Sequence, residues 1–200
     1  DLAFDVTYEA TGPANQTAAS TAEQDIFKGH IDQPGHYRGW IRVGSTRLNV
    51  DCHCVRDRSW GPRRDDATEM HIGYYHATAS TQDAFLMVGH DSGSDDRFAF
   101  MTGYLIRDGV HAPLVEGTAA IERDADLAPR ACRISARDTL GRMLDAEGEG
   151  LAAVALQQQP GMFNWSSLAE WRFNGVTAHG ELQDTWHPDK YRNFARRKHL

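Results

Sequence analysis

Residues 51–63, DCHCVRDRSWGPR, continue a strand pattern and then fill it with charge. Alternate residues from Leu48 to Cys54 are apolar, so this segment predicts a β-strand with one apolar face. Two arginines, an aspartate and a histidine follow within residues 53–58, before Gly61-Pro62 ends the strand. Unpaired ions are costly in a half-buried strand, so these groups predict either a structural ion network or a functional site.

Composition limits the class of protein. The chain has 200 residues, 40% hydrophobic and 24% charged, which suits a globular protein with a sizeable core. Its formal net charge of −7 argues against a nucleic-acid partner, which would require a basic face. No apolar run approaches the roughly 20 residues of a membrane helix, so we expect no membrane span. Basic residues gather near the C-terminus, and residues 189–200 are predicted to form a solvated tail.

The three cysteines, Cys52, Cys54 and Cys132, are few and odd in number, so the expected compartment is reducing and cytoplasmic. Cys52 and Cys54 are two residues apart in a strand, which suits packing better than a disulfide between them. Together with His53 they lack the second ligand pair of a zinc site. We therefore expect no metal.

Strand patterns continue along the rest of the chain, separated by turns. Residues 1–9 alternate as an opening strand that should pair with the barrel edge or with another domain. Residues 10–26 are predicted to be a linker, and residues 27–188 a run of about ten strands. The clearest turn signals are Asp108-Gly109, Asn174-Gly175 and Gly44-Ser45, the last joining expected strands at 37–43 and 46–54. Residues 142–147 and 151–157 are expected to be two further strands. This pattern predicts an all-β fold, an antiparallel barrel with at most one short helix.

A barrel of this size can hold one small apolar ligand, or its interior can be filled by aromatic side chains. Both interpretations remain open from the sequence. A ligand pocket would combine aromatic walls with a few polar groups. The residues predicted to line such a pocket are Trp60, Tyr74, Tyr104, Trp165, Trp171, His71 and His90.

Residues 56–63, Arg-Asp-Arg-Ser-Trp-Gly-Pro-Arg, resemble the Arg-Asp-His-Ser-Trp-Gly-x-Arg signature of a lipocalin-like superfamily. It includes the AttH-like proteins, carotenoid 1,2-hydratases, kievitone hydratase and certain pericyclases. The resemblance covers about residues 27–186 and implies a lipocalin-like barrel, the second of two, with residues 1–9 as a terminal strand or remnant of the first. It also implies a companion barrel domain or a homodimer. The motif residues expected to be structural are Arg56, Arg58, Ser59, Gly61 and Arg63.

The chain departs from that signature at Arg58, where the superfamily has histidine, and arginine cannot shuttle protons near neutral pH. His53 lies on the same strand face as Asp57, so these two are the candidate catalytic residues. Asp57 either pairs with Arg56 as a structural staple or faces an apolar cavity as a general acid, with its pKa raised by desolvation.

The sequence contains no Gly-rich phosphate loop, metal cluster or nucleophile elbow with Ser-His-Asp order, which disfavours nucleotide chemistry, metal hydrolysis and acyl transfer. Acid–base chemistry without a cofactor remains. The sequence therefore predicts a hydratase, dehydratase, cyclase or isomerase for a hydrophobic small molecule such as an isoprenoid, steroid-like or polyketide compound. One alternative is a non-catalytic carrier of such a ligand. The other is a structural barrel that completes a companion domain, with the site at the junction.

Overall fold

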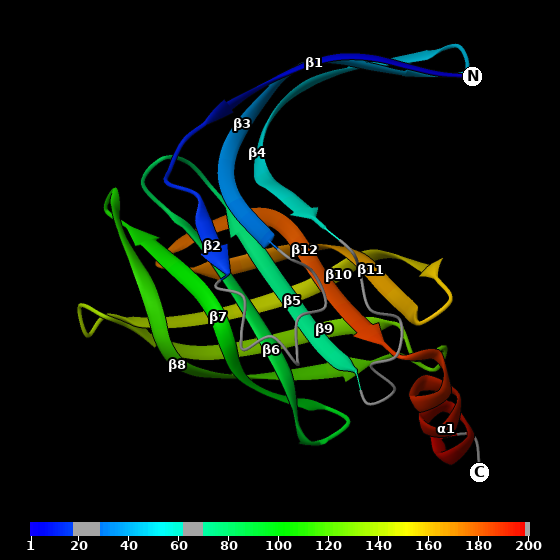
Figure 1. Ribbon diagram of the computed structural model, residues 1–200. Coiled ribbons are helices and arrows are strands. Elements are labelled where there is room, and N and C mark those ends of the chain that lie inside the picture. The colour runs from blue at the N-terminus through cyan, green and yellow to red at the C-terminus, as the bar shows by residue number, and fades with distance from the viewer. Residues whose placement is uncertain (18–28, 62–69, 199–200) are drawn as a thin grey trace.

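The computed structural model describes residues 1–17, 29–61 and 70–198. Almost all of them lie in antiparallel strands, and one short helix follows the last strand, as the sequence predicted. The elements in Figure 1 are β1 (Leu2–Ala10), β2 (Asn15–Thr17), β3 (Gly29–Val43), β4 (Thr46–Trp60), β5 (His71–Thr78), β6 (Ala84–Ser94), β7 (Arg97–Arg107), β8 (Val110–Arg123), β9 (Pro129–Asp138), β10 (Met143–Gln159), β11 (Met162–Phe173), β12 (Val176–Trp186) and α1 (Pro188–Lys198).

Eight strands close into an antiparallel barrel in the order β10-β11-β12-β5-β6-β7-β8-β9. Closure depends on the last strand, β12, which pairs with β5 so that Trp186 lies opposite His71 and Gly180 opposite Ala77. A closed barrel has no free edge strand, and this removes a common route to aggregation. The predicted all-β barrel is confirmed.

The remaining four strands form a second sheet with β3 in the middle (Figure 1). β4 pairs with β3 along its whole length, from Val43 opposite Thr46 at the turn to Gly29 opposite Trp60. β1 and β2 pair with the other edge of β3. The opening strand therefore has a partner, and that partner is β3 rather than a barrel strand.

The sequence predicted about ten barrel strands over residues 27–188, but the barrel begins at β5. Residues 29–60 belong to the second sheet. The sequence did not predict this, because alternation predicts a strand but not the sheet that it joins. The predicted strands 142–147 and 151–157 are one strand, β10, in which a register shift between Gly150 and Ala152 absorbs the break in the pattern. Part of the expected linker also forms a strand, β2.

Aromatic side chains fill much of the barrel interior. Trp171, Tyr75 and Phe85 are fully buried there, within one cluster contributed by all eight strands. Their rings meet edge to face, with centroids 5.2 Å apart for Phe85 and Trp171 and 4.9 Å apart for Phe85 and Phe173. Burial of each large apolar side chain contributes about 1.5–3 kcal/mol. The barrel therefore has an apolar core of its own, separate from the second sheet.

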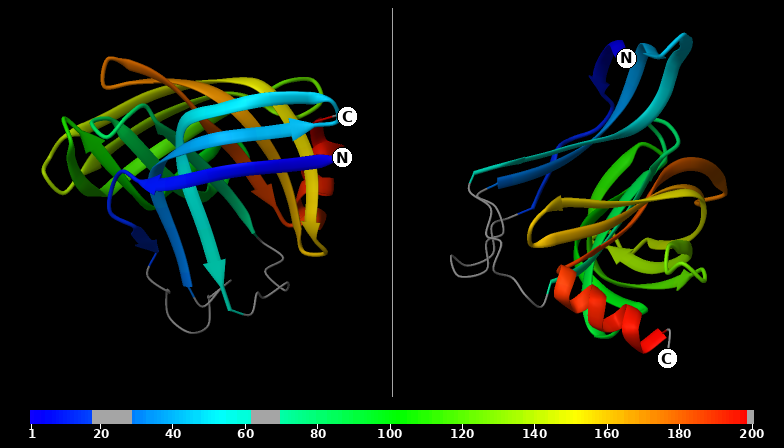
Figure 2. Two further views of the ribbon diagram at one scale, coloured as in Figure 1. Left: turned by 90° about the horizontal axis from the view of Figure 1, so that it is seen from above. Right: turned by 90° about the vertical axis from the view of Figure 1, so that its right-hand side faces the viewer.

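A second apolar cluster lies on the outer face of the barrel wall formed by β5, β6 and β7. Its members include Tyr74, Leu86, Val88 and Tyr104, and Val55 of β4 packs against them. The β1–β4 sheet thus lies against one wall of the barrel, while α1 covers one end (Figure 2). We call the region between sheet and wall the junction.

The basic segment expected to be a solvated tail is helix α1 from Pro188 to Lys198. Phe194 is fully buried and stacks on Trp186, with ring centroids 4.9 Å apart. The segment is a packed helix rather than a solvated tail because the ring of Phe194 gives it one apolar face, which packs on the end of the barrel. In the described part of the chain, no helix is long and apolar enough to cross a bilayer.

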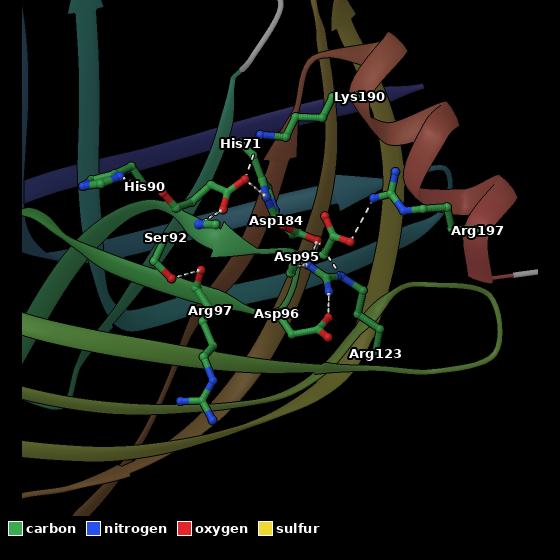
Figure 3. Close-up of polar contacts among 12 residues, drawn as sticks. His71, His90, Ser92, Asp95, Asp96, Arg97, Arg123, Asp184, Lys190 and Arg197 are labelled. Carbon is green, nitrogen blue, oxygen red and sulfur yellow. Dashed lines mark hydrogen bonds and ion pairs between the residues drawn. The ribbon is translucent and has the colours of Figure 1, made fainter.

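An ion network lies beneath this helix (Figure 3). The fully buried Asp184 accepts hydrogen bonds from His71 Nε2 at 2.9 Å and from Arg123 Nε at 2.9 Å. Lys190 of α1 donates to Asp91 at 2.7 Å, and that carboxylate lies 3.6 Å from His71 Nδ1. Burial tends to raise the pKa of Asp184, but the hydrogen bond from His71 and the charge of Arg123 outweigh it and lower the pKa.

We expect Asp184→Asn to destabilise the protein by about 1–3 kcal/mol, because it removes one of the two carboxylate partners of the buried Arg123 and leaves only the half-exposed Asp96. Urea unfolding at pH 7 measures the change. The control is Glu122→Gln, which removes an exposed carboxylate 3.6 Å from Arg133 and should change stability by less than about 1 kcal/mol. Equal unfolding midpoints for wild type and Asp184→Asn would contradict a stabilising network.

The network also gives a pH dependence. The pKa of Asp184 is lower in the folded protein than the value of about 3.9 in an unfolded chain. The contribution of Asp184 to the free energy of unfolding is therefore complete above its pKa in the unfolded chain, and it is lost as pH falls through its pKa in the folded protein. Unfolding curves from pH 7 to pH 2 should show wild type and Asp184→Asn converging only below about pH 4. A constant difference over the whole range would contradict this.

Candidate functional site

The β3–β4 hairpin brings four polar side chains together at the junction. Its turn begins at Gly44, whose φ of 57° is in the left-handed region, and it sets the register along both strands. In this register His30 lies opposite Ser59, and Asp32 lies opposite Asp57. Opposite residues and residues two apart share a face of the sheet. The four side chains therefore lie on the face that carries Val55 toward the barrel.

Hydrogen bonds connect these groups and a barrel tyrosine. His30 Nε2 is 2.9 Å from Asp32 Oδ2, and His30 Nδ1 is 3.0 Å from Ser59 Oγ and 3.5 Å from Asp57 Oδ1. From β5, Tyr74 Oη donates to Asp32 Oδ1 at 2.6 Å. We call His30, Asp32, Asp57, Ser59 and Tyr74 the junction cluster. A carboxylate only accepts, so Nε2 of His30 carries the proton that faces Asp32, and Nδ1 can accept.

The cluster runs from the interior to solvent. The side chain of Asp32 is fully buried, whereas that of Asp57 is 53% exposed. Burial, followed by the charge of Asp32, raises the pKa of Tyr74 well above 10, so its hydroxyl remains a donor to that carboxylate. The buried end thus fixes the histidine ring, and the exposed end offers a carboxyl group to a ligand.

Tyr104 lies beside this buried end. It is fully buried, and burial and the nearby charge of Asp32 raise its pKa well above 10. Its hydroxyl has no hydrogen-bond partner among the residues that the structure describes. Tyr104 therefore adds a second aromatic ring, next to that of Tyr74, at the buried end of the junction cluster.

The two predicted catalytic residues lie on one face of β4 but are not in contact. His53 stacks on His36, with ring centroids 4.4 Å apart. It is four residues from Asp57, which corresponds to about 13 Å along a strand. Partial burial, followed by the charge of His36, lowers the pKa of His53. The histidine that approaches Asp57 is His30.

The other motif residues lie mainly on the opposite face of β4. The guanidinium of Arg56 is 5.2 Å from the centre of the Tyr8 ring, and Arg58 is exposed. The indole of Trp60 lies against Gly29, where a Cβ atom would come within 2.3 Å of it. Gly61 follows the strand with a φ of 95°, and Arg63 lies outside the described residues. Because Arg56 and Asp57 point to opposite faces, the strand does not favour a staple between them.

The residues predicted to line a ligand pocket lie in several places. Tyr74 and Tyr104 are at the junction, whereas Trp171 is inside the barrel. Trp165 donates to Tyr191 of α1 at 3.0 Å. His71 belongs to the ion network under the helix, and the exposed His90 contacts the carbonyl of Asp91 (Figure 3). A hollow of about 760 Å³ lies along β6–β12, and none of the seven predicted residues lines it.

Sequence reasoning missed His30 and Asp32, although the signal was present. The predicted strand began at Tyr37, so the pairing was not followed back from the turn at Gly44-Ser45. Continued along both strands, that pairing places the two residues opposite Ser59 and Asp57.

The same residues could hold a cation, since potential ligand atoms of His30, Asp32 and Asp57 lie within 4.8 Å of one another. However, both oxygens of Asp32 already accept hydrogen bonds, one from His30 and one from Tyr74. The arrangement as it stands therefore matches a network for proton transfer better than a set of open metal ligands.

The profile of a protein family described as a domain of unknown function, DUF7064, matches residues 1–188. The chain belongs to this family. The DUF7064 fold is similar to kievitone hydratase from Nectria haematococca, with a TM-score of 0.57, 12% identity, and coverage of 94% of this chain and 62% of that one. It is also similar to an AttH candidate from Nitrosomonas europaea, with a TM-score of 0.59, 13% identity, and coverage of 91% and 62%.

These likenesses confirm the fold that the sequence resemblance implied. The DUF7064 chain spans less than two thirds of the length of both structures. No curated protein matches it in sequence. Its chemistry must therefore be argued from the junction cluster itself.

Tyr74→Phe should destabilise this DUF7064 protein by about 1–3 kcal/mol, because it leaves an oxygen of buried Asp32 without its donor. The adjacent Tyr75 provides the matched control. Its hydroxyl is buried without a partner among the described residues, so Tyr75→Phe should cost less or even stabilise. Urea unfolding of both variants tests this. Equal losses would show that the Tyr74–Asp32 bond contributes nothing specific.

Proposed function

We propose that this DUF7064 protein is a cofactor-independent acid–base enzyme that adds water to, or removes water from, a hydrophobic small molecule. The observation that carries the proposal is the approach of His30 to Asp57 at 3.5 Å, with the buried Asp32 holding the other side of the ring. Water addition to a double bond needs one group that gives a proton and another that accepts one. An imidazole and a carboxyl group in contact can supply both.

The surroundings support an apolar substrate. Val55, Tyr74 and Tyr104 border the cluster with buried aliphatic and aromatic surface. Aromatic faces also stabilise the positive charge that develops when an alkene is protonated. Asp57 is exposed, so a ligand can reach it from solvent. Isoprenoid, steroid-like and polyketide compounds share this apolar character.

Each residue of the pair has a distinct role in the proposal. Asp57 donates the proton to the substrate or takes it back, and His30 activates the water. Asp32, held by Tyr74, keeps His30 in one tautomer and orientation. His53 lies about 13 Å along the same face, too far to exchange a proton with Asp57 directly, and contacts the far end of a long substrate. One protein with a similar fold is a hydratase, and this supports the same reaction class here.

Kievitone and lycopene are suitable first probes, because one is named in the similar hydratase and the other is an apolar polyene. The protein is incubated with each in ¹⁸O-labelled water, and mass spectrometry detects the gain of one labelled water. Asp57→Asn and His30→Gln should each slow the reaction by about 10²–10⁴-fold, the usual contribution of proton transfer. Glu9→Gln, an exposed carboxylate 3.8 Å from Arg38 in the same sheet, is the control.

The outcomes separate the alternatives. Full activity of Asp57→Asn would overturn the acid–base proposal. Loss of activity in His53→Ala but not in His30→Gln would overturn the role of His30 and show that the substrate requires His53. Tight binding of a probe by wild type with no chemical change in any probe would favour a carrier.

A further inference from the structure

We propose that Ser59 is a nucleophile activated by His30 and Asp32, and that the junction cluster cleaves carboxylic esters with apolar acyl groups. This activity is distinct from the water addition proposed above. It rests on a continuous contact from carboxylate to imidazole to hydroxyl. Asp32 Oδ2 lies 2.9 Å from His30 Nε2, and His30 Nδ1 lies 3.0 Å from Ser59 Oγ.

The protonation of this series follows from its buried end. Asp32 is fully buried and accepts from Tyr74 Oη and from His30 Nε2–H. Nδ1 of His30 is then the basic nitrogen, and it faces the Ser59 hydroxyl. A buried aspartate fixes the tautomer of a histidine, which in turn takes a proton from serine, as in a Ser-His-Asp triad, although here Nε2 faces the aspartate and Nδ1 the serine, the reverse of the usual arrangement. Such triads are recognised by geometry and roles, whatever their order in the chain.

Strand pairing fixes the relative positions of Ser59, His30 and Asp32, which the sequence alone did not reveal. The expectation against acyl transfer rested on the missing nucleophile elbow. Here His30 and Ser59 are opposite each other in the β3–β4 register, and Asp32 is two residues from His30 on the same face. The backbone of a rigid hairpin therefore fixes all three positions, which is the requirement for an activated nucleophile.

The two remaining polar groups also fit this role. Asp57 Oδ1 lies 3.5 Å from His30 Nδ1, where the carboxylate in its ionised form, rather than the protonated form that water addition uses, stabilises the imidazolium that forms when Ser59 loses its proton. Ser59 is only half-buried, so an ester can reach it. Val55 lies on the same face four residues before Ser59 and belongs to the apolar cluster of the barrel wall. This apolar surface favours a hydrophobic acyl group.

The proposed reaction has two balanced halves. Ser59 Oγ bonds to the ester carbonyl carbon while its proton passes to His30 Nδ1, and the bond from that carbon to the alcohol oxygen then breaks. The alcohol leaves with the proton from His30. Water next attacks the acyl-serine while giving a proton to His30, and the carboxylic acid leaves as Ser59 regains its proton. No oxidant, metal or cofactor takes part in these steps.

The probes are p-nitrophenyl butyrate and a fluorophosphonate, which reacts with activated serines. We expect wild type to hydrolyse the ester and to carry one phosphonyl adduct on Ser59, identified by peptide mass spectrometry. Ser59→Ala should lose the adduct and slow hydrolysis by about 100-fold or more. Asp32→Asn should slow both reactions by misplacing the proton on His30. The control is Ser135→Ala, an exposed serine bonded to Asp145 on the far side of the barrel.

Adduct mapping on the wild-type protein does not depend on whether a variant folds. An adduct on any other residue, no adduct at all, or unchanged hydrolysis by Ser59→Ala would overturn the proposal. Because ester cleavage and labelled-water gain are separate measurements, failure here leaves the water-addition proposal standing, and the reverse also holds.

Discussion

The register of the β3–β4 hairpin is the constraint on which the rest of the junction depends. One turn at Gly44 and Ser45 fixes fifteen consecutive pairs, from Val43 and Thr46 down to Gly29 and Trp60. A slip by one residue would turn every side chain of β4 to the other face. It would carry Asp57 and Ser59 away from His30 and expose Val55. The polar cluster and its packing on the barrel wall are thus specified together.

Local patterns in the sequence were enough to predict much of the fold. The turns at Asp108-Gly109 and Asn174-Gly175 have positive φ at both residues, as hairpins with two-residue loops require. Alternation predicted most of the strands. Neither signal carries information on which strands meet across the molecule, so the barrel was expected to include residues 29–60. The closing pair of β5 and β12 is a property of the whole chain.

The candidate site was predicted only in part, because Pro34 and Gly35 hid the strand that carries His30 and Asp32. These residues break the strand pattern, so the predicted strand began after them and His30 was left out. In the structure β1 ends opposite Gly35 and β2 begins opposite Asp32, so Pro34, which has no N–H to donate, falls between the two. Gly35 leaves space for the ring of Tyr8, which a Cβ atom there would strike. Asp57 was identified because its motif is local, whereas its partners are fixed by tertiary contact.

The pairing of β12 with β5 also determines when the protein can fold. His71 and Asp184, which bond across this seam, are 113 residues apart in the chain. A contact between such distant residues costs the entropy of closing a large loop before the contact can stabilise the chain, so barrels of this kind fold slowly. During synthesis β5 leaves the ribosome long before β12 exists, and its edge has no partner in the meantime. Until β12 is made, that edge exposes unpaired backbone groups, so the incomplete barrel is a form of the chain that is prone to aggregation.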